Sequence, residues 1–186
     1  YLSATAMPTV VRQLNESLSF KKVYLEKVFA NGKTITIRWG LVKPTRHHVF
    51  IECRGLIYAR ARIKGFKHLR FRELRSESLA SMDGFSSYHE MLRDLRRIYP
   101  FVKDDDWVTV IEFEVLERLE KPVSKEWLTK TAATASREAL ARGVYRDPRE
   151  RVALANVAAG RGILEALEVS GVSLARFIEI LASLRL

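Results

Sequence analysis

The chain has 186 residues, of which 47% are hydrophobic and 29% are charged, and its formal net charge is +10. This composition is typical of a folded protein and excludes a disordered or fibrous one, and no apolar run approaches the ~20 residues that span a bilayer. A single cysteine and four histidines without ligand spacing exclude an internal disulfide and a cysteine-rich zinc site. We therefore expect a cytoplasmic protein that uses no metal or other cofactor and no membrane.

The positive charge is concentrated between Lys33 and Arg75. This range holds twelve basic residues against two acidic ones, which is the whole excess of the chain. A field of one sign, interleaved with aromatic residues, is typical of proteins that bind nucleic acid. The alternative is a solvated surface of a thermophilic protein, which the single glutamine and the many arginines fit. The predicted nucleic-acid contacts are Arg60, Arg62, Lys64, Lys67, Arg70, Arg72 and Arg75.

Residues 1–17 have no clear period and are interpreted as a loosely attached arm. The apolar residues Val23, Leu25, Val28 and Phe29 predict a short helix over residues 20–29, which ends at the turn-forming pair 31–32. The alternation in TITIR, residues 34–38, then predicts a strand. Its two isoleucines face the core, and its threonines and Arg38 lie on the other face.

Two strands and a tight turn follow, then a helix and a long strand. VFIEC and GLIYARARI, residues 49–53 and 55–63, predict a hairpin around Arg54-Gly55. Ser87 and Glu90 have the spacing of a capping box before a helix that ends at Pro100. WVTVIEFEVLE, residues 107–117, has the alternation of a strand. Strands on both sides of a helix indicate an α+β domain.

The composition changes to alanine and leucine after Lys121-Pro122, which predicts a domain boundary. Helices are expected near 124–142, 149–159, 163–169 and 173–184, packed as a small bundle. The segment 151–171 resembles a helix-turn-helix, a pattern that is also common in small bundles. The bundle is therefore predicted to pack or to bind a protein partner.

Three blocks resemble the ASCH domain, a branch of the PUA-like superfamily. They are NGKTITIRWG (31–40), SMDGFSSYHEMLRDLRRIYP (81–100) and WVTVIEFEVL (107–116), in this order. The resemblance covers about residues 20–118 and implies a small β-barrel with flanking helices. The expected fold class is therefore α+β, with an arm over 1–17, a PUA-like β-barrel domain over 18–120 and an all-α helical bundle over 122–186.

The family signature matches this chain at Lys33 and Arg38. Asn31 stands where the family has glycine, and Thr36 stands where it often has glutamate. With its threonine, the chain is similar to small bacterial enzymes that hydrolyse acetylated cytidine. In those enzymes a lysine, a threonine three residues later and a glutamate before the helix carry the reaction. The resemblance therefore implies Lys33, Thr36 and Asp83 as catalytic residues here.

Two functions remain open from the sequence. The leading prediction is an RNA-binding or other nucleic-acid-binding protein with a base-sized pocket, to which Arg38 and Trp39 also belong. The alternative is an amidohydrolase that removes an acyl group from a small nucleoside such as acetylcytidine. Each residue also has a structural explanation: a lysine can pair with a carboxylate, a threonine favours strands, and Asp83-Gly84 is typical of a turn.

Overall fold

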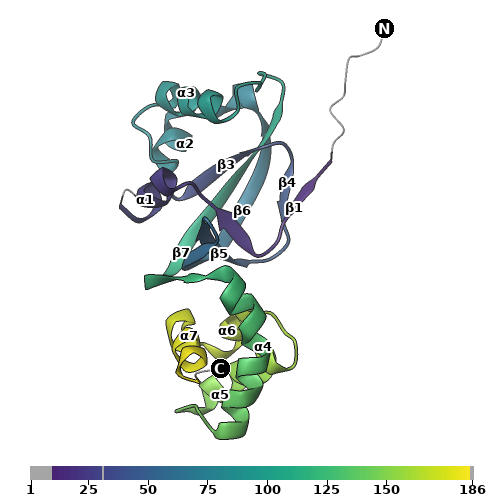
Figure 1. The fold of residues 1–186 in the computed structure, drawn as a ribbon. Coiled ribbons are helices and arrows are strands. Elements are labelled where there is room, and N and C mark those ends of the chain that lie inside the picture. The colour runs from purple at the N-terminus through teal and green to yellow at the C-terminus, as the bar shows by residue number, and fades with distance from the viewer. Residues whose placement is uncertain (1–9, 31, 185–186) are drawn as a thin grey trace. The chain divides into compact units, whose positions relative to one another are not determined.

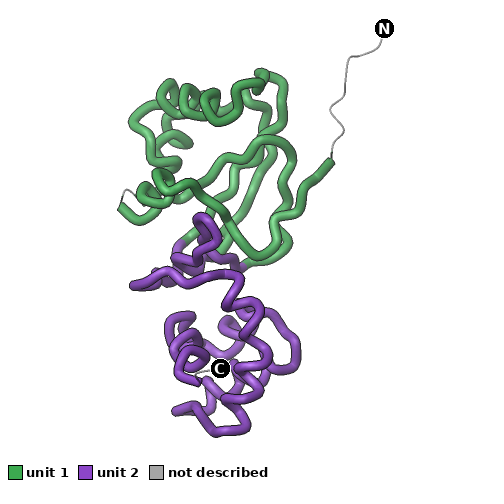
Figure 2. The backbone as a smooth tube through the Cα atoms, viewed as in Figure 1, with its two compact units in different colours: residues 1–47, 62–114 green, residues 48–61, 115–186 purple. Residues whose placement is uncertain are grey.

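A computed structural model describes residues 10–30 and 32–184, which Figure 1 colours along the chain. The fold is mixed α+β, as predicted. The chain divides into two compact units, residues 1–47 with 62–114 and residues 48–61 with 115–186 (Figure 2). In the two described ranges no helix is both long and apolar enough to cross a membrane. The predicted division at residues 121–122 stays a prediction, because the strand that contains it continues to Ser124.

Among the described residues, one sheet has five strands in the order β2, β5, β6, β7, β3. Its strands are β2 (Ser17–Ser19), β5 (His48–Cys53), β6 (Leu56–Arg70), β7 (Trp107–Ser124) and β3 (Ile35–Trp39). A second sheet pairs β1 (Arg12–Leu14) in parallel with β4 (Val42–Pro44). The expectation of a loosely attached arm over residues 1–17 was therefore wrong for Arg12–Leu14, which pair with β4, since strands of three residues are too short to show a period. The closed barrel stays a prediction.

The hairpin of β5 and β6 forms where the sequence predicted it. Arg54 and Gly55 have φ angles of 52° and 78°. Positive φ at both central residues is the geometry of a type I′ turn, whose twist matches that of the flanking strands. Ile57, Ala59 and Ala61 on one face of β6 are fully buried. The alternation in this strand is therefore confirmed.

Strand β3 pairs antiparallel with β7, with Thr36 opposite Ile111. Ile35 and Ile37 belong to a core cluster with Phe71 and Met91, as predicted. Thr36, on the other face, is buried as well, with only 5% of its surface exposed. The second face of this strand is thus covered, which period-two alternation alone did not indicate.

Four short helical segments complete the first unit. They are α1 (Lys22–Ala30), η1 (Phe71–Leu74), α2 (Glu77–Met82) and α3 (Tyr88–Ile98). The Ser76 hydroxyl accepts a hydrogen bond from an amide in the first turn of α2, and the Ser87 hydroxyl does the same for α3. The predicted capping box is modified, because the Glu90 carboxylate accepts from Ser86 rather than from Ser87. Val23, predicted to face the core, is 52% exposed.

The second unit contains the four predicted C-terminal helices. They are α4 (Lys125–Arg142), α5 (Pro148–Ala158), α6 (Ile163–Ser170) and α7 (Leu174–Ser183). Leu128, Leu154 and Phe177 lie in their common core. The exposed side chains of α6 include Glu165 and Glu168, which would repel a phosphate backbone. The helix-turn-helix resemblance of this segment stays a prediction.

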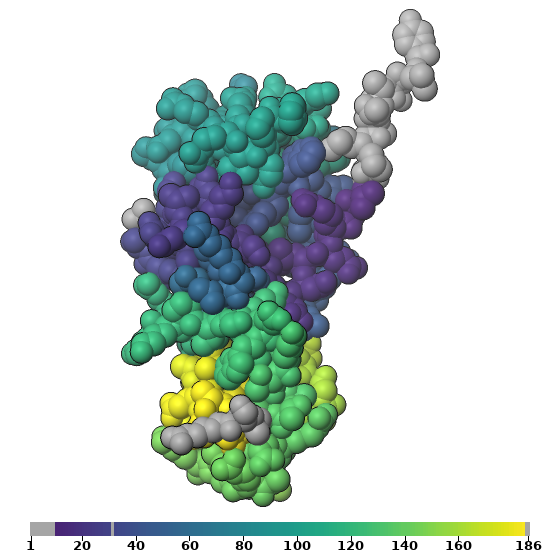
Figure 3. All heavy atoms as spheres, viewed as in Figure 1, coloured from purple at the N-terminus to yellow at the C-terminus, as the bar shows by residue number. Residues whose placement is uncertain are grey.

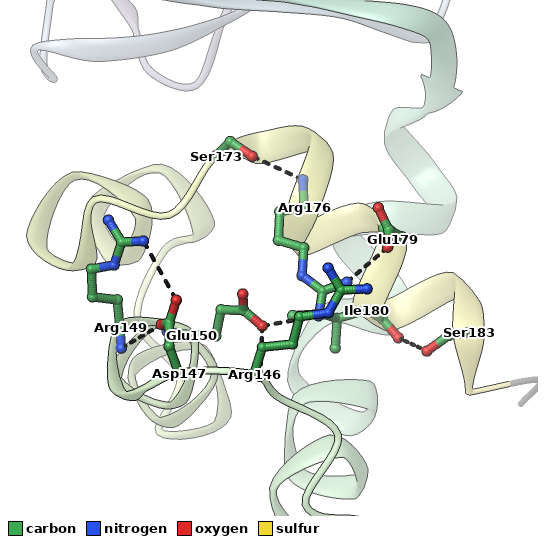
Figure 4. Close-up of polar contacts among 9 residues, drawn as sticks. All are labelled: Arg146, Asp147, Arg149, Glu150, Ser173, Arg176, Glu179, Ile180 and Ser183. Atoms are coloured by element: carbon green, nitrogen blue, oxygen red, sulfur yellow. Dashed lines mark hydrogen bonds and ion pairs between the residues drawn. The ribbon is translucent and has the colours of Figure 1, made fainter.

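A polar network joins α5 to α7 inside this unit (Figure 4). The Asp147 carboxylate caps α5 by accepting the amides of residues 149 and 150. Glu150 Oε1 accepts from the Arg176 guanidinium at 3.0 Å, and Glu179 Oε1 accepts from it at 2.8 Å. The Glu150 side chain is 9% exposed, whereas that of Glu179 is 64% exposed. Arg176 therefore has one buried and one solvated carboxylate partner.

We expect Glu150→Ala to lower the free energy of unfolding by about 2–3 kcal/mol, because it removes a charge-assisted hydrogen bond in a buried setting. Glu179→Ala is the matched control and should cost less than about 1 kcal/mol, since exposed ion pairs contribute little. Urea unfolding followed by circular dichroism measures both. Equal costs for the two variants would contradict the role assigned to Glu150.

Candidate functional site

Lys33, Thr36, Arg38 and Asp83 line one cavity of about 150 Å³. Thr36 and Arg38 lie on the same face of β3, as the alternation predicted. Lys33 precedes the strand, and Asp83 is the C-cap of α2, fifty residues later. The cavity wall is completed by mainly apolar side chains, among them Phe20, Ile37, Phe85, Leu95 and Ile98. The structure therefore brings the predicted catalytic residues together.

The backbone holds the two segments of the site side by side. The Thr34 amide donates to the carbonyl of Met82 at 2.8 Å. Gly84 then turns the chain with a φ of +83°, a conformation that L side chains rarely adopt. A Cβ at Gly84 would also meet the side chain of Lys27 at 3.5 Å. The Asp-Gly pair that the sequence marked as a turn thus also places the Asp83 carboxylate beside Lys33.

Lys33 and Asp83 form an ion pair inside the protein. Their exposed fractions are 5% and 3%, and the Lys33 ammonium also contacts the Asp83 carbonyl at 3.4 Å. Burial lowers the pKa of Lys33, although Asp83 acts against this change. Burial raises the pKa of Asp83, although Lys33 acts against it. The two pKa values therefore move toward each other, which favours a lysine able to act as a base and a carboxyl able to act as an acid.

Arg38 connects the cavity to the end of the sheet. Its guanidinium donates to the Ser19 carbonyl at 2.7 Å and lies 5.2 Å from the centre of the Phe20 ring. Arg38 thereby bridges β3 and β2, the two outermost strands in the sheet order. Burial lowers the pKa of Arg38. Its Nε atom is buried and has no hydrogen-bond partner among the described residues.

Tyr24 and Asp94 also line the cavity, and the sequence did not predict them. The Tyr24 hydroxyl donates to Asp94 Oδ2 at 2.6 Å, and the Arg97 guanidinium donates to Asp94 Oδ1 at 2.6 Å. Figure 3 shows the teal side chains of α2 and α3 bordering the purple ones of the N-terminal segments. Asp94 sits three residues after Met91 and four before Ile98, on the apolar stripe of α3. An acidic residue within an apolar stripe is the sequence feature that could have identified Asp94 as a candidate site residue.

Because of their hydrogen bonds, Tyr24 and Asp94 offer a ligand only hydrogen-bond acceptors in this part of the wall. An ionised carboxylate only accepts, and a hydroxyl whose proton is committed to a carboxylate can only accept from a further group. Lys33 and Arg38 supply donors instead. The cavity is therefore polarised, with donors from β3 and its preceding turn and acceptors from α1 and α3.

Titration of Tyr24 tests this hydrogen bond. Burial, followed by the Asp94 hydrogen bond, raises the pKa of Tyr24 to about 12. Because this is above the unfolded value of about 10, the stability that protonated Tyr24 contributes is complete below pH 10 and is lost as the pH rises toward 12. We expect a late component in the tyrosinate absorbance that disappears in Tyr24→Phe and moves to lower pH in Asp94→Asn. A titration unchanged in Tyr24→Phe would contradict the assignment.

The predicted phosphate contacts are largely engaged by acidic residues. Three of them pair with glutamates of β7: Arg60 with Glu117 at 3.6 Å, Arg62 with Glu114 at 2.8 Å and Lys64 with Glu112 at 3.7 Å. Two others contact Asp105. Arg72 pairs with the Asp105 carboxylate, and Arg70 donates to the Asp105 backbone carbonyl. Lys67 lines a second cavity and Arg75 is exposed. The field of this segment is therefore weaker than its sequence indicated.

Trp39, which was predicted to belong to the pocket, is not among the residues that line the cavity. The Trp39 indole N–H donates to Asp106 at 3.4 Å, and its ring lies 6.2 Å from that of Tyr99 within the core cluster. Asn31 lies outside the described residues. Over residues 10–30 and 32–184, no group of three or more histidine, cysteine, aspartate or glutamate side chains could hold a metal ion.

No protein-family model and no curated protein matches the sequence. Among solved structures, the chain is similar to an ASCH domain from Lactobacillus crispatus, with 12% identity, 56% of this chain and 80% of that chain covered, and a TM-score of 0.49. An ASCH structure from Zymomonas mobilis has 14% identity, coverage of 63% and 78%, and a TM-score of 0.47. The N-terminal domain of Staphylothermus marinus McrB has 11% identity, coverage of 66% and 82%, and a TM-score of 0.42. These structures include ASCH domains, the family that the sequence motifs resemble.

Proposed function

We propose that the protein binds nucleic acid, RNA being the expected form, and takes one nucleobase into the cavity. The observation that carries the proposal is that Lys33, Thr36, Arg38 and Asp83 line a single cavity of about 150 Å³. A cavity of about this size accommodates a benzene ring. Apolar walls with a few convergent polar groups are typical of ligand sites, and perturbed pKa values add to this indication.

The polarity of the wall favours a particular kind of ring. A base with a carbonyl or ring nitrogen can accept from Arg38 or Lys33, and an exocyclic amine can donate to Asp94 or Tyr24. Cytosine and adenine have both features, whereas uracil presents a second carbonyl in place of the amine. The preferred ligand is therefore a base with an amino group, and the one-ring cytosine fits the cavity volume better than a purine.

Binding is tested by titrating cytidine and a short cytidine-containing RNA into the protein. We expect Arg38→Met, which keeps the apolar part of the side chain, to weaken binding of both ligands by about tenfold or more, the effect of a lost charge-assisted hydrogen bond. Arg62→Met removes the same charge from an exposed side chain paired with Glu114 and should leave cytidine affinity within about twofold. Failure of the wild type to bind either ligand would overturn the proposal.

A second candidate is hydrolysis of an acyl-amide on the bound nucleoside, and the pKa directions of Lys33 and Asp83 favour it. In this reaction the pair reacts in its neutral form, with its shared proton on Asp83, so that the Lys33 amine takes the Thr36 hydroxyl proton and the alkoxide forms a bond to the acyl carbon. The carbon–nitrogen bond then breaks, and the leaving amine takes a proton from Asp83. Water hydrolyses the acyl-threonine and restores the protons.

Incubation with acetylcytidine decides between binding and hydrolysis. If the second candidate holds, cytidine and acetate appear in equal amounts, and Thr36→Ala lowers the rate by at least the ~10²–10⁴ that acid–base groups contribute. Thr45→Ala, at an exposed threonine in the same unit, is the matched control and should keep the full rate. Binding without release of acetate would remove the enzyme from consideration and leave the first proposal intact.

A further inference from the structure

Two basic side chains lie at the cavity, Lys21 in its wall and Lys27 beside it. Lys21 lines the cavity and is exposed. The Lys27 ammonium lies 3.6 Å from the centre of the Phe85 ring and 5.9 Å from that of Tyr24, and both rings belong to the cavity wall. Neither lysine forms an ion pair with any of the described residues. The charge of Lys21 is therefore available to an anion at this place, whereas that of Lys27 also acts on Asp83 and Glu90, where it works to lower the pKa of both carboxyls.

The N-terminus of α1 adds to the same field. The nine-residue helix begins directly after Lys21, whose carbonyl accepts the amides of Tyr24 and Leu25. The first turn contains no acidic residue. Since the amides at a helix N-terminus carry partial positive charge and lack partners within the helix, they favour a bound anion. Nothing in this turn neutralises that end of the helix.

The cavity itself is the independent indication of a ligand. Its wall combines apolar side chains with the polar groups of Lys33, Thr36 and Arg38, as is typical of ligand sites. Its volume of about 150 Å³ suffices for one six-membered ring but not for a whole nucleotide. The sugar and phosphate of a bound nucleotide must then remain outside, next to the residues that border the cavity.

We propose that Lys21, Lys27 and the N-terminus of α1 form a phosphate-binding subsite for the nucleotide whose base occupies the cavity. The proposal rests on the proposed function, because the base has to enter the cavity first. It replaces the β6 segment as the main phosphate contact of this unit. The phosphate belongs either to a free nucleotide or to an RNA chain, and the two sources are separated by the ligands used.

Cytidine, cytidine monophosphate and a short cytidine-containing RNA are titrated into the wild type and into Lys21→Gln/Lys27→Gln. Glutamine keeps an extended side chain against Phe85 while removing the charge. The wild type should bind the monophosphate about tenfold or more tightly than cytidine, as expected for charge-assisted hydrogen bonds. In the double variant this advantage of the monophosphate over cytidine should fall to about twofold.

The control is Lys43→Gln/Lys103→Gln, which removes two exposed charges from the same unit and should preserve the advantage. If cytidine binds but the phosphate adds no affinity, or if the control loses as much as the double variant, the subsite is overturned and base binding stands. If none of the three ligands binds the wild type, the proposed function itself fails.

The RNA titration identifies the source of the phosphate. A loss of RNA affinity in the double variant, with a salt dependence reduced by about 0.7 per lost contact, assigns the subsite to RNA. A loss for the monophosphate alone assigns it to free nucleotides. Retained circular dichroism and thermal unfolding of the variants verify that the measured losses come from the ligand contacts.

Discussion

Replacing Asp83 by alanine is expected to lower the free energy of unfolding by about 3–5 kcal/mol, the cost of removing one partner of a buried ion pair. Asp83 and Lys33 are 3% and 5% exposed, and they are direct partners. Without the carboxylate, a buried ammonium would lose its counter-ion and would have to deprotonate or reach water. Urea unfolding measures the change, with the two compact units analysed as separate transitions if they do not unfold together.

A double-mutant cycle separates this pair from general damage. Lys33→Met leaves the carboxylate unpaired and should also destabilise strongly. The double variant Lys33→Met/Asp83→Ala should be less destabilised than the sum of the two single variants, because neither charge remains buried alone. Asp104→Ala, at an exposed acid, should change the free energy by less than about 0.5 kcal/mol. Strict additivity of the two single costs would contradict the coupling.

The sequence predicted those residues of the candidate site that stand out by their spacing from near neighbours in the chain. The alternation of TITIR placed Thr36 and Arg38 on one face, and the turn chemistry of Asp83-Gly84 located the other segment. Their meeting was implied by the resemblance to ASCH domains, since nothing local relates residues fifty positions apart. In the structure these side chains line one cavity. What they do to a ligand stays a prediction.

Charge counting along the chain failed where the counter-charges come from a distant strand. Between Lys33 and Arg75 the sequence has two acids, but β7 places Glu112 and Glu114 beside Lys64 and Arg62. A window of consecutive residues cannot detect such pairs, because strand neighbours in a sheet are separated by whole elements. For the same reason, charge counting does not identify Lys21 and Lys27. They are only two charges in a mixed segment, although they lie at the cavity.

Tyr24 and Asp94 illustrate the same limit for the pocket itself. Asp94 interrupts the apolar stripe of α3, but only the packing of α3 against α1 makes it the partner of Tyr24 at 2.6 Å. Their hydrogen bond fixes which groups of the wall accept. The proposed selectivity of the cavity therefore depends on tertiary contacts, whereas the proposed hydrolysis depends on residues that local spacing already marked.

The second large effect concerns that selectivity. Wild-type protein should bind cytidine at least about tenfold more tightly than uridine, as a well-placed base contact discriminates by about 1–3 kcal/mol. The cytosine amine can donate to Asp94, whereas the uracil carbonyl at the same position would meet acceptors that repel it. The two affinities are compared by calorimetry at one salt concentration. Because neither nucleoside carries a phosphate, the difference reports on the cavity alone.

Asp94→Ala should reduce this preference to about twofold or less, because the Tyr24 hydroxyl is then released from Asp94 and can donate to a carbonyl instead. Asp104→Ala, outside the wall of the cavity, should keep the full preference. The Asp94→Ala variant should bind cytidine more weakly and uridine equally well or better. Loss of folded protein cannot produce such opposite changes in the two affinities. If the wild type binds uridine as tightly as cytidine, Asp94 and Tyr24 do not contact the base, and the polarity of the wall serves the fold rather than the ligand.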